Sequence, residues 1–458
     1  MEVIVLAGGL GTRLRSVVHE IPKSLAPISG LRRPFFSEAY KKADASCGEG
    51  RSSGSRTPEG AFSCTGIPFL GFLLDWLVEQ GVDHVVFSVG YLREQVIAYV
   101  QGHQWPFSYD FAVEEKPLGT GGGIRLALGL CREDKVFVVN GDTFYPVALR
   151  EMPFDKAITL ALKPMKDFDR YGAVTVLPAS AGLEASKNYF SGRCPKNQFS
   201  EAVAMPTRAD ALIVTAFQEK KHCAEGLING GVYAIDRTRL DMRSLPEKFS
   251  FEKEVLEPGA AIGEIGGWVS DAYFIDIGVP EDYEKAQWAI PAWFAVRKAS
   301  RAVLEASATT LFLDRDGVLN RHLPGDYVKS WAQWDWMPGM LQELPGWAAK
   351  FHHIVLVSNQ RGVGKGVMTD EDLSRVHAQM MAEVLEAGGR IDLILSCTAV
   401  SDDDPRRKPN TGMFREACAL FPDIDAKSSV MLGDTQTDAA FAANCGMPFI
   451  LLNPEAAS

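Results

Sequence analysis

The stretch that decides the fold of the first half of the chain is Val3–Pro27, VIVLAGGLGTRLRSVVHEIPKSLAP. Its apolar start, Val3–Leu6, leads into a turn with three glycines, and this pattern predicts a buried parallel strand that feeds a loop. Glycines allow backbone N–H groups to close around a phosphate, because no Cβ stands in the way. Two cations, Arg13 and Lys23, follow the turn. The stretch therefore predicts a binding site for a polyphosphate.

The turn departs from the two common phosphate-binding patterns, since it lacks both the Gly-Lys-Ser/Thr ending of the Walker loop and the spaced glycines of GxGxxG. A glycine-rich turn can also be an ordinary connection between a strand and a helix. The longer string LAGGLGTRL, followed by PKSLAP, is more specific, and it resembles the sugar-1-phosphate nucleotidyltransferases. Those enzymes join a nucleoside triphosphate to a sugar 1-phosphate and release pyrophosphate. The resemblance extends, with interruptions, to about Gln287.

The resemblance implies two loops around the nucleotide, with Arg13 and Lys23 as catalytic cations. The second loop, EKPLGTGGG, follows an expected strand at Tyr109–Val113 and precedes an expected helix at Ile124–Leu130. It lies at the carboxyl edge, where open α/β sheets bind ligands, although it could also be a flexible connection. The expected nucleotide-binding residues are Leu6, Ala7, Gly8, Gly9, Gly11, Thr12, Glu115, Gly119, Thr120 and Gly121.

An acidic pair is expected to hold Mg²⁺ in the first domain. The apolar run KVFVV ends in Asn140-Gly141-Asp142, and a carboxylate at the end of a strand suits a hard cation. An aspartate in a turn is more often only a cap. The resemblance implies that Asp142 is a metal ligand and that the matching ligand is Asp276, in YFIDIGVPEDY. The ion would bridge the two phosphates in an in-line displacement.

The strings ITLALKPMKDFDRYGAV, FQEKK and GLINGGVYAID resemble the sugar-recognition half of these enzymes. The resemblance implies that Glu219 accepts hydrogen bonds from sugar hydroxyls and that Lys220 pairs with the sugar phosphate. The alternative for Lys220 is a solvated charge at an edge. The glycines beside Asn229 would allow close approach of the backbone. The expected residues on the sugar side are Tyr171, Gly172, Glu219, Lys220, Asn229 and Gly230.

At Thr310 the pattern of an apolar strand ending in acids restarts, with TLFLDRDGVLN. Asp314 and Asp316 stand two residues apart, and close carboxylates repel unless they share a cation. DxDG followed by VLN resembles the opening motif of the haloacid-dehalogenase (HAD) phosphatases. The resemblance implies that Asp314 is the nucleophile and Asp316 the general acid and base. A structural turn with two acids is the alternative, and three further motifs in the family's order count against it.

The further motifs would complete a phosphatase site. IVLVSNQ ends in Ser358 and Asn359, which can bind phosphate oxygens, and Lys408 in RRKPN would neutralise the phosphoryl charge. VMLGDTQTD supplies Asp434 for Mg²⁺, with Asp438 in support. The expected metal ligands of this domain are Asp314, Asp316 and Asp434.

DRDGVLN, SNQRGVGKG and RRKPNTGM most resemble the small, capless phosphatases of heptose 1,7-bisphosphate and histidinol phosphate. Those relatives often carry a Cys/His zinc loop just before the lysine. The corresponding string here, SCTAVSDDDPRRKP, contains Cys397 alone and no histidine, so zinc is not expected. Arg407 remains as the expected contact to the distal phosphate of the sugar.

Length and composition agree with two or three domains in 458 residues. Hydrophobic and charged fractions of 46% and 23% are typical of a soluble globular protein. A formal net charge of −11 argues against nucleic acid or an anionic membrane as a partner. The eight cysteines show no CxxC spacing, and neither a signal peptide nor an 18-residue apolar run is present. We expect a cytoplasmic protein, and the sequence leaves open whether it forms a homo-oligomer.

The predicted fold class is α/β with two doubly wound domains: a Rossmann-like, GT-A-like nucleotidyltransferase and a HAD-like phosphatase without a large cap. The predicted domains are residues 1–290 and 309–458, joined by a helical linker at 291–308 in a helix-rich segment interrupted at Pro291. Two insertions are expected, at about 31–65, which is Gly/Ser-rich with a disordered centre, and at about 178–212.

Together the two halves resemble a heptose 1-phosphate guanylyltransferase fused to a heptose-bisphosphate phosphatase. Such a chain would remove the 7-phosphate of heptose 1,7-bisphosphate and transfer GMP from GTP to the heptose 1-phosphate, with Mg²⁺ as cofactor. GTP rests on the resemblance, because no residue visibly reads guanine. One alternative is a transferase for mannose 1-phosphate or another sugar, fused to a generic phosphatase. Another is that one half is a catalytically silent regulatory or scaffold module.

Overall fold

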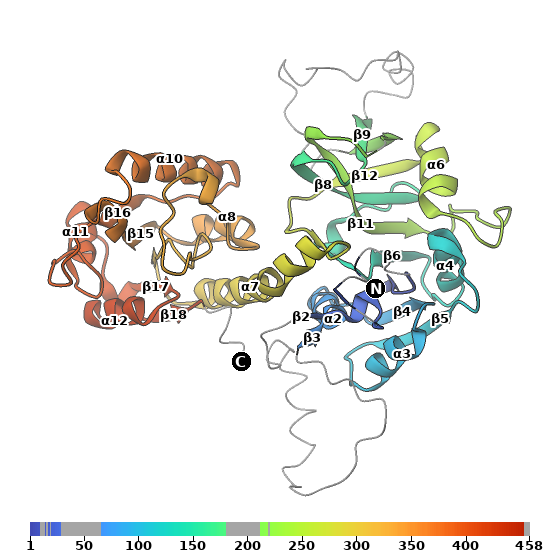
Figure 1. The fold of residues 1–458 in the computed structure, drawn as a ribbon, viewed down its shortest axis with the longest axis horizontal. Helices are drawn as coiled ribbons and strands as arrows, with labels where there is room; N and C mark the ends of the chain where they lie inside the picture. The colour runs from blue at the N-terminus through green and yellow to red at the C-terminus, as the bar shows by residue number, and fades with distance from the viewer. Residues whose placement is uncertain are drawn as a thin grey trace, which may run out of the picture. The chain divides into compact units, whose positions relative to one another are not determined.

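The computed structural model describes residues 1–9, 14, 17–18, 20–28, 66–179, 211–218 and 220–452. Most of both expected insertions therefore lies outside the described residues. The chain divides into two compact units between Ala286 and Gln287, inside helix α7 (Pro280–Glu305) (Figure 1). In the described part of the chain, no helix is long and apolar enough to cross a membrane.

The first unit is built on a nine-stranded sheet with the order β5-β4-β1-β6-β11-β8-β12-β10-β9. The strands from β5 to β6 are parallel, whereas β11 runs antiparallel to both β6 and β8. The repeated strand and helix pattern predicts only the parallel half. The bounds are β1 (Glu2–Leu6), β4 (His84–Val89), β5 (Ser108–Val113), β6 (Lys135–Asn140), β8 (Ile158–Phe168), β9 (Ala173–Pro178), β10 (Leu212–Phe217), β11 (Cys223–Asp236) and β12 (Ile265–Val269), with helices α2 (Phe69–Glu79), α3 (Arg93–Gln101) and α4 (Gly119–Leu128).

The second expected insertion joins two strands that pair with each other. Strands β9 and β10 are antiparallel, with Leu212 opposite Pro178, and the Ala179 N–H donates to the Ala211 carbonyl at 2.8 Å. Both ends of the insertion are therefore held together by the sheet. Extra residues at such a site cost little closure entropy, which explains how the sheet accommodates them.

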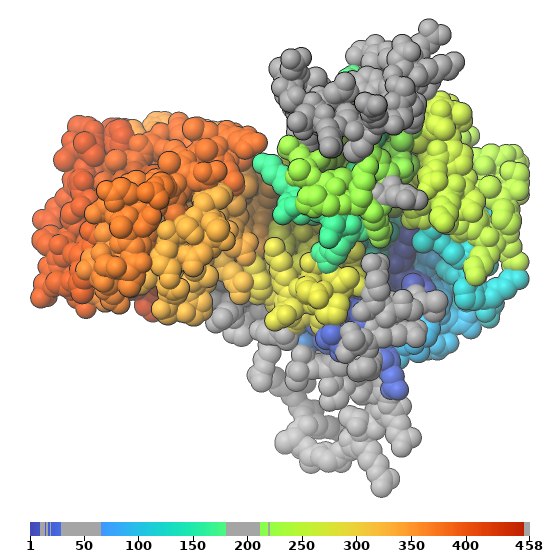
Figure 2. Space-filling view, turned by 45° about the horizontal axis from the view of Figure 1, so that its top comes forward, coloured from blue at the N-terminus to red at the C-terminus, as the bar shows by residue number. Residues whose placement is uncertain are grey.

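The second unit contains a five-stranded, all-parallel sheet with the order β16-β15-β14-β17-β18. Leu311 and Leu313 of the central strand join one hydrophobic cluster, and Phe312 joins another, so both faces of the sheet are covered. The outer atoms of this unit form one continuous body in the space-filling view (orange to red in Figure 2). The bounds are β14 (Thr310–Leu313), β15 (His353–Asn359), β16 (Leu393–Cys397), β17 (Ser429–Gly433) and β18 (Phe449–Leu451), with helices α8 (Met340–Lys350), α9 (Arg361–Gly364), α10 (Asp370–Glu386), α11 (Gly412–Leu420) and α12 (Gln436–Cys445).

Helix α7 continues through Pro291, so the expected interruption there is wrong. Proline supplies no N–H to the helical ladder, but its neighbours Ile290 and Ala292 are fully buried, and their packing offsets that loss. Ala292, Val296, Ala299 and Val303 follow at helical spacing and join the core of the second unit. The segment expected to be a linker thus contributes one apolar face to that core.

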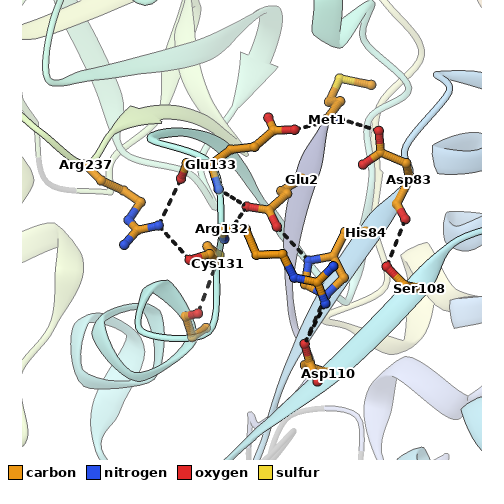
Figure 3. A network of polar contacts seen from close by, with 11 residues as sticks. Met1, Glu2, Asp83, His84, Ser108, Asp110, Cys131, Arg132, Glu133 and Arg237 are labelled. Atoms are coloured by element: carbon orange, nitrogen blue, oxygen red, sulfur yellow. Dashed lines mark hydrogen bonds and ion pairs between the residues drawn. The ribbon is translucent and has the colours of Figure 1, made fainter.

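A buried polar network supports the amino end of the first sheet (Figure 3). The Glu2 carboxylate lies 2.8 Å from His84 Nδ1, and its other oxygen accepts from the backbone N–H groups of Arg132 and Glu133. The other ring nitrogen of His84 lies 3.1 Å from Asp110. Because Glu2 and His84 are both buried, each group depends on the others for its hydrogen bonds.

Replacing Glu2 with alanine is expected to lower the opening free energy of strands β1 and β4 by about 2–4 kcal/mol, since it leaves two backbone donors and an imidazole buried without partners. Native-state hydrogen exchange of the amides of β1 and β4 measures this value. Glu94→Ala is the control, because that exposed carboxylate pairs with its neighbour Arg93, and it should change stability by less than about 0.5 kcal/mol. Equal losses in both variants would contradict the role given to Glu2.

Candidate active sites

Two aspartates far apart in sequence meet in the first unit. The short strand β7 (Thr143–Phe144) pairs with β13 (Ile275–Asp276), so that Asp276 lies opposite Thr143. The Ile277 N–H donates to the Asp142 carbonyl at 3.0 Å. The turn that carries Asp142 also packs on the first loop, because a Cβ at Gly141 would lie 2.6 Å from the Leu6 carbonyl oxygen. The structure thus brings the expected metal pair beside the strand that leads into the glycine-rich loop.

The charges of this pair are only partly balanced. Lys23 Nζ lies 2.6 Å from Asp142 Oδ2, at the start of the short helix η1 (Lys23–Leu25). Burial, followed by the neighbouring Asp142 carboxylate, raises the pKa of Asp276 to about 6, and Lys23 opposes that shift. Two carboxylates that share one ammonium supply oxygen ligands of the kind that a hard divalent cation prefers. Asp142 and Asp276 could therefore hold Mg²⁺.

Glu114 is a candidate site residue that sequence reasoning missed. It directly follows β5, and a Cβ at Gly8 or Gly123 would lie 3.2 or 2.8 Å from its Oε1. The Leu118 N–H donates to its other oxygen at 2.9 Å, and burial raises the pKa of Glu114. By contrast, the side chain of the expected residue Glu115 is 81% exposed and pairs with Arg93. The sequence could have indicated Glu114 through its position, because it directly follows the carboxyl end of a predicted parallel strand, where ligands bind.

The helix after β5 starts five residues earlier than expected, since α4 begins at Gly119 rather than at Ile124. Its first turn, which the sequence analysis assigned to the second loop, packs against residues 247–252. A Cβ at Gly119 would lie 2.5 Å from the Phe249 carbonyl oxygen, and one at Gly121 would lie 2.2 Å from the Phe249 ring. Thr120 Oγ1 donates to Glu252 and accepts from the Phe251 N–H. These contacts are a structural reason for the glycines and for the threonine. Nucleotide binding by Gly119, Thr120 and Gly121 stays a prediction.

Among the expected sugar-side residues, Tyr171 is electrostatically coupled to the acidic pair. Its ring packs edge-on to Phe274, with centroids 5.7 Å apart, and its pKa is raised by burial and then by Asp276. The side chain of Asn229 bonds within its own strand, to Tyr233 and to the Gly231 N–H.

The two expected glycines of the sugar side lie in tight packing contacts, whereas the expected lysine is exposed. A Cβ at Gly172 would lie 2.5 Å from the Gln218 carbonyl oxygen, and one at Gly230 would lie 2.3 Å from the Tyr145 ring. Both positions therefore require glycine for packing, and Lys220 is exposed. Four expected residues lie outside the described part of the chain: Gly11, Thr12, Arg13 and Glu219.

In the second unit, three carboxylates form a cluster, and two of them pair with one buried lysine. Lys408 Nζ lies 2.9 Å from Asp314 Oδ1 and 2.6 Å from Asp438 Oδ1. Ligand atoms of Asp314, Asp434 and Asp438 all lie within 4.8 Å of one another. A Cβ at Gly317 would lie 2.0 Å from Asp434, and Gly317 has φ +88°, which explains the glycine of the DxDG motif.

Electrostatics identify the two carboxylates of this cluster that could hold a divalent cation. Asp438 is already occupied, because Lys408 binds one oxygen and Thr435 donates to the other at the start of α12. Asp434 Oδ1 is buried without a hydrogen-bond partner among the described residues. Burial, together with the neighbouring carboxylates, raises the pKa of Asp434 to about 8 and that of Asp314 to about 6. Asp314 and Asp434 could therefore hold Mg²⁺.

The carboxylate of Asp316 does not join this cluster. It accepts two hydrogen bonds from Arg315 and one each from Asn320 and Gln360. Burial opposes ionisation, but the Arg315 guanidinium and these hydrogen bonds hold the pKa of Asp316 below its usual value. Arg315 is itself fully buried and contacts His377 at 3.2 Å. Sequence reasoning missed Arg315 and Gln360, although both stand beside expected motif residues.

The residues expected to contact phosphate make hydrogen bonds to other protein groups. Asn359 exchanges two hydrogen bonds of 3.0 Å with the backbone of Lys408, so it positions the lysine. Ser358 Oγ accepts from Gln360 Nε2 at 2.8 Å. Cys397 Sγ lies 3.6 Å from Asp404 Oδ1, and burial raises the pKa of the thiol. Arg407 Nε donates to Asp402 at 2.9 Å.

The fold and the two acidic sites define an α/β chain with a nucleotidyltransferase-like first unit and a HAD-like second unit. A protein-family model described as HAD-hydrolase-like matches residues 405–455. The chain is 37% identical over 292 residues to a D-glycero-alpha-D-manno-heptose 1-phosphate guanylyltransferase of Aneurinibacillus thermoaerophilus, which covers 63% of this chain and 97% of the relative. A Campylobacter jejuni guanylyltransferase of the same name is 32% identical over 284 residues, 62% of this chain and 97% of the relative.

The C-terminal part has a different relative. A D-glycero-alpha-D-manno-heptose-1,7-bisphosphate 7-phosphatase of Mycobacterium tuberculosis is 38% identical over 138 residues, 29% of this chain and 71% of the relative. The chain therefore belongs to two families: the heptose 1-phosphate guanylyltransferases through its N-terminal part, and the heptose-1,7-bisphosphate 7-phosphatases through its C-terminal part.

Mg²⁺ should stabilise the second unit more at pH 8 than at pH 6. The raised pKa values of Asp434 and Asp314 mean that protons compete with the cation below about pH 8, so apparent affinity should rise by up to about tenfold per pH unit. The shift in thermal unfolding midpoint with Mg²⁺ measures this. Asp434→Asn should abolish the Mg²⁺-dependent rise in the unfolding midpoint of this unit. The control is Asp423→Asn, which changes an exposed carboxylate paired with His353 and should leave that rise unchanged. A shift that persists in Asp434→Asn would show that the cation binds elsewhere.

Proposed function

We propose that the chain is a bifunctional enzyme of nucleotide-sugar biosynthesis. The second unit removes the 7-phosphate of D-glycero-α-D-manno-heptose 1,7-bisphosphate, and the first unit transfers GMP from GTP to the resulting 1-phosphate, giving GDP-heptose and pyrophosphate. One observation carries this proposal: the chain joins two acidic sites whose relatives are named for consecutive reactions, since a 7-phosphatase leaves the 1-phosphate on which the transferase acts. We place both reactions in the cytoplasm.

The phosphatase reaction starts from the Asp314 carboxylate. An oxygen of Asp314 attacks phosphorus, the bond to the sugar oxygen breaks, and an aspartyl phosphate forms. Lys408, paired with Asp314, offsets the charge that develops. Mg²⁺ held by Asp314 and Asp434 would neutralise the phosphoryl oxygens. Water then attacks the same phosphorus, which restores the Asp314 carboxylate and releases inorganic phosphate.

Asp316 handles the protons of this reaction. Its ionised state suits the second half-reaction, in which it accepts a proton from the attacking water. In the first half-reaction the departing sugar oxygen needs a proton, and Asp316 can supply it only after leaving Arg315 and becoming protonated. Arg315 therefore sets the balance between the two states.

The transferase reaction is a displacement at the α-phosphorus of GTP. A phosphate oxygen of the sugar 1-phosphate attacks, and the bond to the β-phosphate oxygen breaks, so that pyrophosphate leaves. Lys23, with Arg13, would neutralise charge on the phosphates, and Mg²⁺ held by Asp142 and Asp276 would orient them. In this proposal Glu114 receives the N1–H and 2-amino hydrogens of guanine, because its carboxylate lies beside Gly8 of the nucleotide loop.

Two asparagine variants separate the reactions and test their order. Asp142→Asn should still convert the bisphosphate to the 1-phosphate but lose nucleotidyl transfer by about a hundredfold or more. Asp314→Asn should make GDP-heptose from the 1-phosphate but almost none from the bisphosphate, because a second phosphate in the sugar pocket would lose its hydration without compensation. Product analysis by anion-exchange chromatography measures both. A nucleotide-linked sugar that keeps its 7-phosphate would contradict the order.

Glu114→Gln should lower kcat/KM for GTP by roughly 5- to 150-fold, the equivalent of about 1–3 kcal/mol for a bidentate contact to a base. The loss should be smaller for inosine triphosphate, which lacks the 2-amino group. Glu115→Gln is the matched control, because its exposed carboxylate pairs with Arg93. If Glu115→Gln alone reduced the use of GTP, Glu115 rather than Glu114 would contact the base.

A further inference from the structure

A fully buried arginine lies beside the proposed proton donor of the phosphatase. Arg315 Nη2 donates to both carboxylate oxygens of Asp316, at 3.0 and 2.9 Å. Arg315 Nη1 lies 3.2 Å from Nε2 of His377, on helix α10. The remaining nitrogen, Nε, has no hydrogen-bond partner among the described residues. Within that part of the chain, the guanidinium group therefore depends on one carboxylate and one imidazole for its hydrogen bonds.

The imidazole of His377 is the acceptor in this contact. A guanidinium group carries donors and no acceptor, so Nε2 presents its lone pair and the proton of the neutral ring lies on Nδ1. Burial, followed by the charge of Arg315, lowers the pKa of His377 to about 4, which agrees with a neutral ring. His377 thus holds the guanidinium group through a different nitrogen from the one that binds Asp316.

A tryptophan ring lies over the same guanidinium group. The guanidinium carbon of Arg315 is 6.0 Å from the ring centroid of Trp334, at the limit of a cation–π contact. Trp336 meets Trp334 edge-on, with centroids 5.0 Å apart, and donates from Nε1 to Glu383 of α10 at 2.7 Å. Helix α10 is therefore connected to this part of the site twice, through Glu383 and through His377.

The backbone of Arg315 is held independently of His377. The carbonyl oxygen of Arg315 accepts from the N–H groups of residues 318–320 at 2.8 to 3.3 Å, and its own N–H donates to Asp314 at 2.7 Å. Loss of the imidazole would therefore free the guanidinium group without releasing the turn that carries the two aspartates.

The ion pair between Arg315 and Asp316 creates a difficulty for the proposed first half-reaction. In that step Asp316 has to turn from Arg315 to the departing sugar oxygen. Opposite charges attract strongly where water is excluded, so a guanidinium group without another partner would follow the carboxylate. A guanidinium group that has its own acceptor, and an aromatic ring over it, keeps its place instead.

We propose that His377 is a positioning residue of the phosphatase, which anchors Arg315 while Asp316 turns to the sugar oxygen. The inference rests on the function proposed for the second unit. When the bond between phosphorus and the sugar oxygen breaks, the proton of Asp316 passes to that oxygen, and Asp316 returns to Arg315 as a carboxylate. His377 exchanges no proton in this step, and its contribution is the fixed position of the cation.

The competing explanation is that His377 only packs helix α10 on the core. A loosened helix would slow the hydrolysis of every phosphate ester by a similar factor, whereas a lost anchor would slow only esters whose leaving group needs a proton. The heptose leaves as a basic alkoxide, but p-nitrophenyl phosphate releases a stable phenolate. The value of kcat/KM reports the steps up to departure of this first product, so the second half-reaction does not enter the comparison.

His377→Leu should lower kcat/KM of the full chain for heptose 1,7-bisphosphate by roughly 10- to 100-fold, less than the whole contribution of a general acid, with little change for p-nitrophenyl phosphate. His377→Gln should recover most of the loss, because its side-chain oxygen can accept from Arg315. Glu383→Ala is the matched control, since it removes another contact of α10. It should leave the ratio of the two kcat/KM values unchanged.

The outcomes distinguish two kinds of failure. If the wild-type chain did not hydrolyse the bisphosphate, the proposed function would be wrong, and an alkyl phosphate that it does hydrolyse would take its place in the comparison. If His377→Leu slowed both esters equally or slowed neither, the positioning role would be refuted and the proposed function would stand. The positioning role would also be refuted if His377→Gln lost as much activity toward the alkyl ester as His377→Leu.

Discussion

The repulsion between neighbouring carboxylates is the constraint on which both sites depend. Asp142 and Asp276 meet in the first unit, and Asp314, Asp434 and Asp438 meet in the second. In each case one lysine lies within 3 Å of a carboxylate, and the pKa values of the remaining acids stay raised. A lone ammonium is therefore not enough, and this residual imbalance favours a divalent cation at each site.

The two units bring their aspartates together in different ways. In the second unit, one all-parallel sheet brings Asp314 and Asp434 together, because each follows a neighbouring strand, β14 or β17. In the first unit the second acid arrives from outside the main sheet, on the two-residue strand β13. Asp438 has two structural roles, since it takes part in the capping box of α12 and accepts a hydrogen bond from Lys408. A change at Asp438 would therefore disturb the start of α12 and the position of Lys408 together.

Sequence patterns predicted what is local and missed what depends on packing. The strands that precede Asp142 and Asp314 were predicted correctly, because an apolar run that ends in an aspartate is a pattern contained within a few consecutive residues. The contacts of Glu114, rather than Glu115, depend on Gly8 and Gly123 from other segments. The continuity of α7 through Pro291 likewise depends on burial of its neighbours, and local propensity cannot report that. The antiparallel half of the first sheet follows from pairings between distant strands, which periodicity does not encode.

The two lysines differ in a way that bears on their chemistry. Lys408 has a side chain that is only 2% exposed, and Asn359 binds its backbone on both sides. Although burial disfavours its charge, Asp314 and Asp438 raise the pKa of Lys408, so it stays charged and fixed. Lys23 has a 14% exposed side chain and lies on a three-residue helix. Lys23 therefore depends on one carboxylate, Asp142, for its position, whereas Lys408 is held by two, Asp314 and Asp438.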